Sequence, residues 1–329
     1  MADLAMREGY GRALAEYGAD HPGVVVLDAD TSASTFSNFF ARRYPERFFN
    51  IGIAEPCMVD VAVGLALGGF VPFVNGFAAL LSLRALEQVR TCVCQARTNV
   101  KLAGHFAGVS DYKDGASHYA ITDLANLRAL PGMTVIVPAD AAEAAAWVSL
   151  VAEFDGPVYL RISRAAALPV YDARTRLAIG RGITLREGAD LALVATGAMV
   201  GRCAQAAQTL AAQGVEARLV EIHTLKPLDR ELLLQAAQET GALVTAEEHS
   251  VVGGLGSAVA ETLAEGWPAV LERVGFRDRF CPTGRDPESL LDACGCSVAD
   301  VLAAARLALE RKDSKPEGRR RQSVKPRRG

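Results

Sequence analysis

Short runs of β-branched residues alternate with longer Ala- and Leu-rich segments along most of the chain. Continuous apolar runs of roughly four to eight residues are typical of parallel strands buried on both faces. In the first half, the predicted strands are residues 24–28, 70–74, 99–104, 133–138 and 157–163, and the predicted helices are residues 55–68, 78–95, 121–129 and 140–153. This alternation predicts an open α/β sheet with helices on both faces.

The alternation breaks at residues 165–188, which contain Pro, Gly and scattered charge, and then resumes. The later predicted strands are residues 190–197, 217–223, 241–248 and 269–276, and the later predicted helices are residues 199–213, 229–239, 256–265 and 297–311. We therefore predict two doubly wound α/β domains, at residues 1–165 and 189–311, with a linker at 166–188. A chain of 329 residues is long enough for two such domains.

Residues 312–329 are basic and almost free of large apolar groups, so we predict a disordered tail there. The whole chain carries a net charge of −3 and is 50% hydrophobic, which excludes a mostly disordered protein and a general polyanion binder. No aromatic residues are interleaved with the basic residues of the tail. We expect neither a nucleic acid nor a membrane as a partner, and a solvated tail is the simpler interpretation.

The first residues lack a charged region followed by an apolar core, so no signal peptide is predicted. The chain has seven cysteines, an odd number, and two pairs of them are separated by a single residue: Cys92 with Cys94, and Cys294 with Cys296. Zinc pairs are typically spaced by two to four residues. We predict reduced thiols in a cytoplasmic protein, and a metal site built from these pairs is the alternative.

An acidic residue, Glu55, lies in the mostly apolar stretch FFNIGIAEPCMVDVAVGLALGGF at residues 48–70. A buried ionised carboxylate is costly unless it is paired, hydrogen-bonded or protonated. The nearest basic residues in sequence are Arg47 and Arg84. Either Glu55 is an ordinary acid at a helix start, favoured by the helix dipole, or its proton has a chemical role.

Several motifs around Glu55 resemble those of a known enzyme family. LDADTSAS (27–34), the run from Tyr44 to Arg90, KDGASH (113–118) and VYLRISR (158–164) resemble the pyrimidine-binding domain of transketolases. LKPLD (225–229) and TAEEHSVVGGLGS (245–257) resemble the transketolase C-terminal domain. The resemblance covers residues 5–310 and corresponds to the second half of a transketolase. The Gly-Asp-Gly metal motif of the first half is absent from this sequence.

The resemblance implies the C-terminal subunit of a split transketolase, which moves a two-carbon ketol unit from a ketose to an aldose. Thiamine diphosphate would lie between this chain and an N-terminal subunit, which would hold the diphosphate and Mg²⁺ or Ca²⁺. An α2β2 assembly of the two subunits is expected. The metal site would therefore lie on the partner and not on this chain.

The resemblance also assigns cofactor roles to individual residues. Glu55 would hydrogen-bond a ring nitrogen of the aminopyrimidine, since a carboxyl group in an apolar site can share a proton with a neutral heterocycle. Phe77 would stack on that ring, although a core position is the usual fate of a phenylalanine. Leu80 would replace a second aromatic as an aliphatic wall of the cofactor pocket, and Asp30 would lie near the cofactor.

Substrate roles follow from the resemblance in the same way. The residues implied are Ser34 and Arg164 for a phosphate, and His105, Asp114 and His118 for sugar hydroxyls. His118 would also manage protons during carbon–carbon cleavage. Alternatively, His105 is a structural histidine with its hydrogen bonds formed at a strand end, and Arg164 belongs to a surface ion pair. His105 and Asp114 are one residue further apart than in the family pattern.

The chain departs from the family at Pro56 and Tyr119, which replace polar residues, so the substrates can differ from ordinary sugar phosphates. Other interpretations are the β subunit of a 2-oxo-acid dehydrogenase, a 1-deoxyxylulose-phosphate-synthase-like enzyme, and a non-catalytic scaffold with the same fold. DGASH and LRISR favour ketol transfer. Glu248 and His249 are predicted to be structural, and the Gly-rich turn at 251–261 suits close packing better than phosphate binding.

Overall fold

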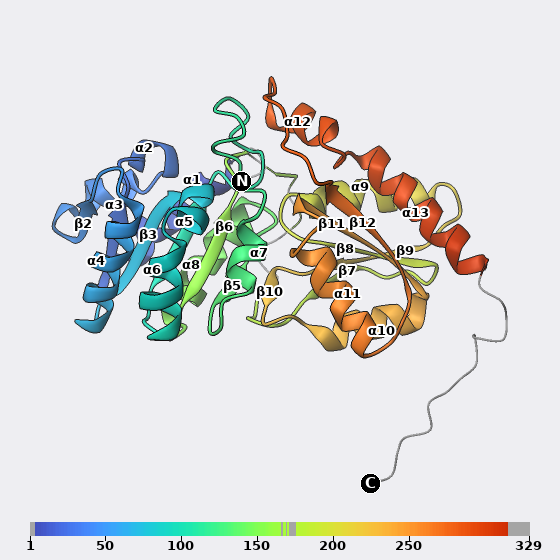
Figure 1. Ribbon diagram of the computed structural model, residues 1–329, viewed down its shortest axis with the longest axis horizontal. Helices are drawn as coiled ribbons and strands as arrows, with labels where there is room; N and C mark the ends of the chain where they lie inside the picture. Colours follow the sequence, from blue (N-terminus) through green and yellow to red (C-terminus); the bar gives the residue numbers. More distant parts are fainter. Residues whose placement is uncertain (1–3, 166, 169, 171–175, 315–329) are drawn as a thin grey trace, which may run out of the picture.

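Two sheets, one from each half of the chain, form the framework of the protein, as the alternation of strands and helices predicts (Figure 1). The computed structural model describes residues 4–165, 167–168, 170 and 176–314. The predicted tail at 312–329 lies outside the described residues from position 315 onward.

The first sheet has seven strands in the order β10-β5-β6-β4-β3-β1-β2, and every strand except β10 is parallel to its neighbours. Its strands are β1 (Val24–Asp28), β2 (Phe48–Asn50), β3 (Val71–Phe77), β4 (Lys101–His105), β5 (Thr134–Ile136), β6 (Val158–Ile162) and β10 (Thr224–Lys226). β1, β4, β5 and β6 are buried along their whole length. Continuous apolar runs are needed there because helices cover both faces.

Eight α-helices of the described residues belong to this domain. They are α1 (Met6–Tyr17), α2 (Ser32–Thr35), α3 (Asn38–Arg43), α4 (Glu55–Leu67), α5 (Ala78–Leu83), α6 (Leu86–Gln88), α7 (Asp123–Arg128) and α8 (Ala141–Glu153). The helix predicted over 78–95 is interrupted into α5, α6 and a π-helix at Val89–Gln95. α1 was not predicted, although Met6, Tyr10 and Leu14 recur every four residues and are buried.

The second sheet has five strands in the order β12-β11-β8-β9-β7. Its strands are β7 (Ile183–Arg186), β8 (Leu191–Ala195), β9 (Ala217–Glu221), β11 (Ala242–Ser250) and β12 (Val270–Phe276), and its helices are α9 (Met199–Ala211), α10 (Arg230–Thr240), α11 (Leu255–Glu265), α12 (Pro287–Ala293) and α13 (Val298–Asp313). β7 pairs antiparallel with β9, so part of the segment 166–188 is a strand of this sheet.

One strand crosses between the two halves of the chain. β10 follows β9 of the second sheet, yet it pairs antiparallel with β5 of the first sheet. The backbone N–H of Val137 also donates to the carbonyl of His223 at 2.8 Å, immediately before β10. A strand from the second half of the chain therefore forms the edge of the first sheet.

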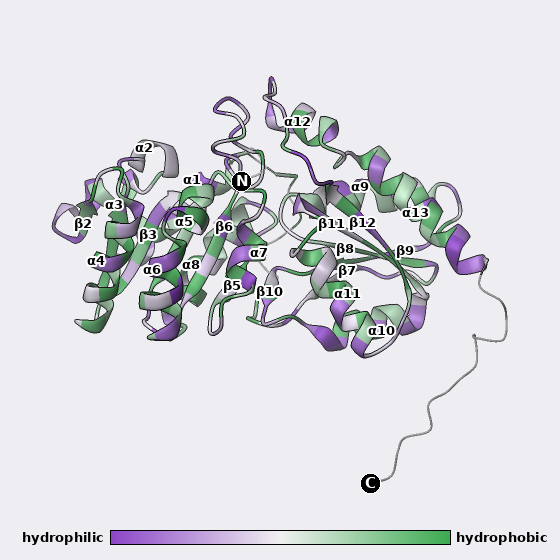
Figure 2. Cartoon of the chain, in the orientation of Figure 1, coloured by the Kyte–Doolittle hydropathy of each residue, from purple (hydrophilic) through white to green (hydrophobic). Residues whose placement is uncertain are grey.

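Apolar residues extend around most of α4, where Figure 2 shows few hydrophilic positions. Such a helix is normally covered on all sides. Here Val61 is 38% and Leu67 76% exposed, and Ile53, just before the helix, is 74% exposed. In the part of the chain that the structure describes, no helix has both the length and the apolar character needed to cross a bilayer.

Candidate functional site

Most of the predicted site residues lie at one edge of the first sheet, where its parallel strands end. Phe77 ends β3 and His105 ends β4, while Asp30 and Arg164 each follow the last residue of a strand by two positions. β1, β3, β4 and β6 are neighbours in this sheet. Ligands of open α/β sheets bind at the carboxyl ends of the strands, so the topology itself makes this edge the candidate site.

Glu55 is the first residue of α4, and its side chain is 2% exposed. Its Oε2 accepts a hydrogen bond from Arg84 Nη1 at 2.8 Å, and the Arg84 side chain is 48% exposed. The described residues offer no hydrogen bond to the other carboxylate oxygen. Glu55 is therefore paired with a residue that follows α5, but only one of its two carboxylate oxygens has a hydrogen-bond partner among the described residues.

Three rings gather next to this edge. The Phe77 ring lies 4.7 Å from that of Phe106 and 5.7 Å, edge on, from the imidazole of His118, measured between centroids. Phe106 has a φ of 61°, an unusual conformation for a bulky residue, which indicates that the loop is held in place by its surroundings. The fold thus brings Phe77 and His118 together, and Leu80, one turn into α5, is partly buried.

Two arginines converge on the same phenylalanine. The guanidinium carbons of Arg7 and Arg164 lie 5.2 and 5.0 Å from the Phe106 ring centroid. Arg7 donates to the carbonyl of Ser34 at 2.5 Å, so Ser34, Arg7 and Arg164 are close neighbours. Burial and the nearby Arg164 both lower the pKa of Arg7. Two guanidinium groups in contact with one ring make a site that attracts an anion.

An aspartate missed in the sequence, Asp111, accompanies the arginines. Its buried carboxylate pairs with Arg164 Nη1 at 2.8 Å. Burial and the neighbouring Asp114 raise the pKa of Asp111 to about 6. Arg7 was missed as well, because the helix that carries it was not predicted. Asp114 itself is exposed on the loop.

Two predicted residues are placed apart from this group of side chains. His105 is fully buried beneath the edge, with its Nε2 3.2 Å from Asn75 Oδ1 and its ring edge-on to Tyr10. Burial and Arg7 lower the pKa of His105 to about 3, so its imidazole is neutral. Asp30 is exposed with a φ of 64°, and its carboxylate accepts from Asn50 Nδ2 at 2.8 Å.

A second buried network, joined by several hydrogen bonds, lies between the two domains. Arg161 donates to Asp123 at 2.7 and 3.2 Å and to the carbonyl of Glu248 at 3.0 Å. Asp123 also accepts from Tyr159 Oη at 2.7 Å. His249 Nε2 lies 3.9 Å from Asp123. Arg161, Glu248 and His249 therefore take part in contacts that join the two domains.

The strand-end site combines three chemical capacities. Glu55 has one unused carboxylate oxygen for a nitrogen-containing heterocycle, Phe77 and Phe106 offer faces for a flat ring, and Arg7 with Arg164 can hold an anion. His118 adds an imidazole beside the rings. This set of groups can hold a flat nitrogen heterocycle next to an anion.

The chain matches two family models in succession. One is the transketolase pyrimidine binding domain, over residues 2–168, and the other is the transketolase C-terminal domain, over residues 180–301.

Similar curated proteins include subunits and longer single chains. The chain is 39% identical to a 6-deoxy-6-sulfo-D-fructose transketolase subunit from Clostridium sp. (strain MSTE9), over 94% of this chain and 95% of that protein. It is 40% identical to a putative transketolase C-terminal section from Methanocaldococcus jannaschii, over 87% of this chain and 90% of that protein. It is also 39% identical to a 1-deoxy-D-xylulose-5-phosphate synthase from Geobacter sulfurreducens, but spans only 48% of that relative.

Solved structures agree with this pattern. A split gene transketolase, described as an inactive β4 tetramer, superimposes with a TM-score of 0.86 at 48% identity and covers 94% of this chain and 99% of that one. A transketolase from Leishmania mexicana superimposes with a TM-score of 0.78 at 22% identity, over 96% of this chain and 47% of that one, which shows the shared fold.

Proposed function

The chain belongs to the transketolase family, and from this premise we propose that it is the C-terminal subunit of a split, thiamine-diphosphate-dependent transketolase. The observation that carries the proposal is the extent of similarity. The chain spans at least 90% of two relatives named as a transketolase subunit or section, but about half of a single-chain synthase. We expect the subunit to work in the cytoplasm with a separate diphosphate-binding subunit that holds Mg²⁺.

In this proposal the aminopyrimidine of thiamine diphosphate binds at Glu55 and Phe77. The unused oxygen of Glu55 would share a proton with a ring nitrogen, while Arg84 keeps the carboxylate oriented. Phe77 would stack on the ring, and Leu80 would close the neighbouring wall. When bound, the cofactor supplies the nucleophilic carbon that accepts the two-carbon unit.

The anionic end of the sugar is assigned to Arg7 and Arg164, with Ser34 beside them. A pair of guanidinium groups suits a phosphate or a sulfonate, since both present several oxygens for N–H donors. His118 and Asp114 would contact the sugar hydroxyls, with His118 exchanging a proton during cleavage. His105 is neutral and buried, so its proposed part is to support this group from below.

The partner subunit would cover the exposed apolar surface around α4. Ile53, Val61 and Leu67 flank or belong to the helix that begins with Glu55. A large exposed apolar surface next to a polar site is typical of a protein interface. Binding of the partner would therefore exclude water from the cofactor pocket, and two such pairs would form the proposed α2β2 enzyme.

The test is to purify the tagged chain from its own host and measure which protein and how much thiamine diphosphate accompany it. The purified complex is then given a ketose phosphate labelled with ¹³C at C1 and C2, together with an aldose phosphate. Appearance of both labels in the ketose made from the acceptor supports the proposal.

Other outcomes separate the alternatives. Release of CO₂ from a 2-oxo acid, with no label transfer from the ketose, would indicate a synthase-like or dehydrogenase-like enzyme. A chain that binds no thiamine diphosphate in the presence of Mg²⁺ and its partner would indicate a scaffold. Sugar sulfonates and sugar phosphates compared as donors would then define the anion that the arginine pair prefers.

A further inference from the structure

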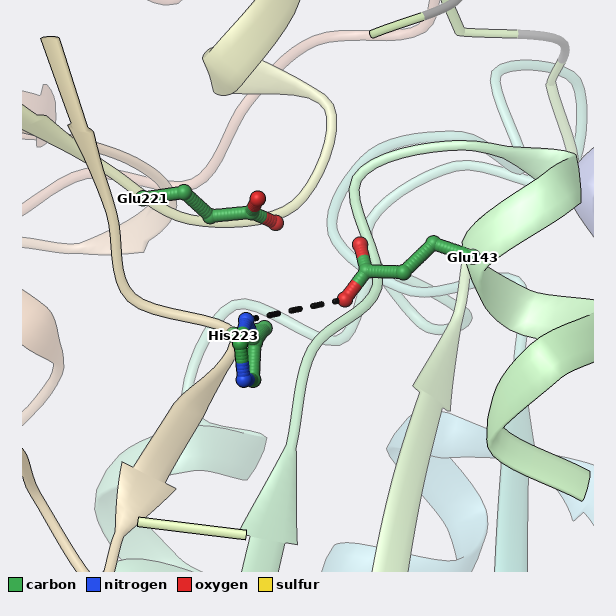
Figure 3. A group of neighbouring side chains, drawn as sticks. All are labelled: Glu143, Glu221 and His223. Carbon is green, nitrogen blue, oxygen red and sulfur yellow. Dashed lines mark ion pairs between the residues drawn. The ribbon is translucent and has the colours of Figure 1, made fainter. Parts of the chain in front are cut away.

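A buried cluster of two glutamates and a histidine lies away from the strand-end site, at the junction of the two sheets (Figure 3). Glu143 is the third residue of α8, Glu221 is the last residue of β9, and His223 precedes β10. One ligand atom from each lies within 4.8 Å of the others. Their side chains are 0–1% exposed.

The three side chains point toward one another but do not satisfy one another (Figure 3). Glu143 accepts from the indole N–H of Trp147 at 2.8 Å and from the backbone N–H of Ala139 at 2.5 Å. Among the described residues, neither oxygen of Glu221 has a hydrogen-bond partner, and the same holds for His223 Nδ1. A fully buried carboxylate without a donor is rare and indicates a missing positive group.

The histidine is oriented as a ligand would be. His223 Nε2 lies 3.2 Å from the carbonyl of Ala178, and because a carbonyl only accepts, Nε2 carries the hydrogen. Nδ1 then presents a lone pair, 3.9 Å from Glu143 Oε1. A lone pair facing carboxylate oxygens is repulsive unless a cation or a proton lies between them. A carbonyl on the second ring nitrogen is also the usual support for a metal-bound histidine.

The cluster brings two acids and one imidazole together in a buried position. Burial raises the pKa of Glu143 to about 7 and the pKa of Glu221 well above its ordinary value, and the Asp140 carboxylate adds to both shifts. Burial also lowers the pKa of His223, which favours the neutral imidazole. No lysine or arginine of the described residues forms an ion pair with either glutamate.

We propose that Glu143, Glu221 and His223 bind one divalent transition-metal ion, for which Zn²⁺ is the best match. Zinc accepts imidazole nitrogen and carboxylate oxygen together, whereas Mg²⁺ and Ca²⁺ prefer oxygen ligands alone and need more of them. Two carboxylates balance the charge of one divalent ion. Because the ligands come from α8, β9 and the residue before β10, the ion would hold the two domains together and would serve structure, not catalysis.

The competing interpretation is a proton shared between the two glutamates. A protonated Glu221 could donate to Glu143 or to His223 Nδ1 and so remove the repulsion without any metal. The two interpretations differ in what Glu221→Gln does. A glutamine can donate in place of the shared proton, but it is a poor zinc ligand.

The test uses the full chain, stripped of metal with a chelator and titrated with Zn²⁺ in equilibrium dialysis. Wild type should bind one zinc per chain at this site, and its melting temperature should rise with zinc and fall again with the chelator. Co²⁺ used as a probe should show no thiolate charge-transfer band. This readout excludes binding by any of the seven free cysteines.

Glu221→Gln and His223→Gln should each weaken zinc binding on the order of 100-fold. Glu248→Gln is the matched control, since Glu248 is equally buried but accepts from the backbone of Val109 and is not part of the cluster. The proposal is wrong if stripped wild type binds no zinc at this site and its melting temperature is insensitive to the ion. It is also wrong if Glu221→Gln binds zinc as wild type does. Should a variant not fold, the cobalt spectrum and the melting shift of wild type decide the question.

Discussion

Two buried acid–arginine pairs in the first domain differ in how completely they are satisfied. Asp123 and Arg161 are both almost fully buried, and together they use two mutual hydrogen bonds, the Tyr159 hydroxyl and backbone carbonyls. Glu55 is just as buried, yet it has a single hydrogen bond, and its partner Arg84 is half exposed.

The difference distinguishes a pair that serves structure from a pair in which one carboxylate oxygen remains open to a ligand. A network with several hydrogen bonds to each charged group stabilises one arrangement of the side chains. The pair of Glu55 and Arg84 leaves one carboxylate oxygen available to a hydrogen-bond donor on a ligand. Counting partners therefore distinguishes the two acids, although their burial is the same.

The largest expected effect is on turnover, from Glu55→Gln. Loss of the shared proton should lower kcat of the reconstituted enzyme by roughly 10²- to 10⁴-fold. The free energy of unfolding should change by about 1 kcal/mol or less, because the partner Arg84 is half exposed to solvent. Steady-state kinetics and urea unfolding measure the two quantities. Glu16→Gln, on an exposed face of α1, is the control. Unchanged turnover in Glu55→Gln would remove the distinction between the pairs.

Asp123→Asn should show the opposite profile. It leaves the Arg161 charge buried without a counter-ion, and it should lower the free energy of unfolding by about 3–5 kcal/mol. The double variant Asp123→Asn with Arg161→Met should recover part of that loss, because no charge then remains unpaired. Urea unfolding of the three proteins tests this. A single variant as stable as wild type would show that the network contributes little.

Arg164→Met should act on substrate binding. Removing one guanidinium should raise KM for an anionic donor roughly 10- to 100-fold, since a hydrogen bond to a charged group contributes about 1.5–3 kcal/mol. Arg7→Met should behave alike, and kcat should change little. A donor without its anionic group should bind equally to wild type and variants. Equal KM values for the charged donor in all three proteins would place the anion elsewhere.

The last prediction concerns pH and Glu248. Burial raises the pKa of Glu248 from 4.5 to about 7, so the folded state keeps a proton that the unfolded state has lost between these values. The contribution of this proton to the free energy of unfolding is complete below pH 4.5 and is lost as the pH rises through 7. The free energy of unfolding should fall by at most about 1.4 kcal/mol per pH unit in this window. Glu248→Gln should flatten urea-unfolding stability across this window, whereas Glu16→Gln should not. A profile unchanged by Glu248→Gln would mean that Glu248 titrates normally.

Much of the fold could be predicted because its signals are local. Val24 to Leu27 form a strand buried on both faces, and such a strand needs an unbroken apolar run. The first residue of α4, Glu55, was also predicted, and an acid at a helix start is favoured by the helix dipole. β10 was missed because three residues carry no periodicity, and it is a strand only because β5 offers an edge.

The site was less predictable because its contacts are distant in sequence. Arg84 lies 29 positions from Glu55 in sequence. It follows α5, and the direction of that helix brings the arginine to the carboxylate. Arg7 reaches the carbonyl of Ser34 only because α1 packs beside the strand ends. Sequence patterns indicate which side chains can do chemistry, whereas the tertiary fold decides which of them meet.

The strand exchanged at β10 limits how such a gene can be divided. A fragment that stopped at the end of the first domain would leave the hydrogen-bonding groups of β5 open to water, and an open edge strand readily pairs with other chains. The second fragment would carry Thr224–Lys226 with nothing to pair against. A break between the two domains would therefore leave an unpaired strand edge on both fragments, which makes the two domains a single unit of inheritance.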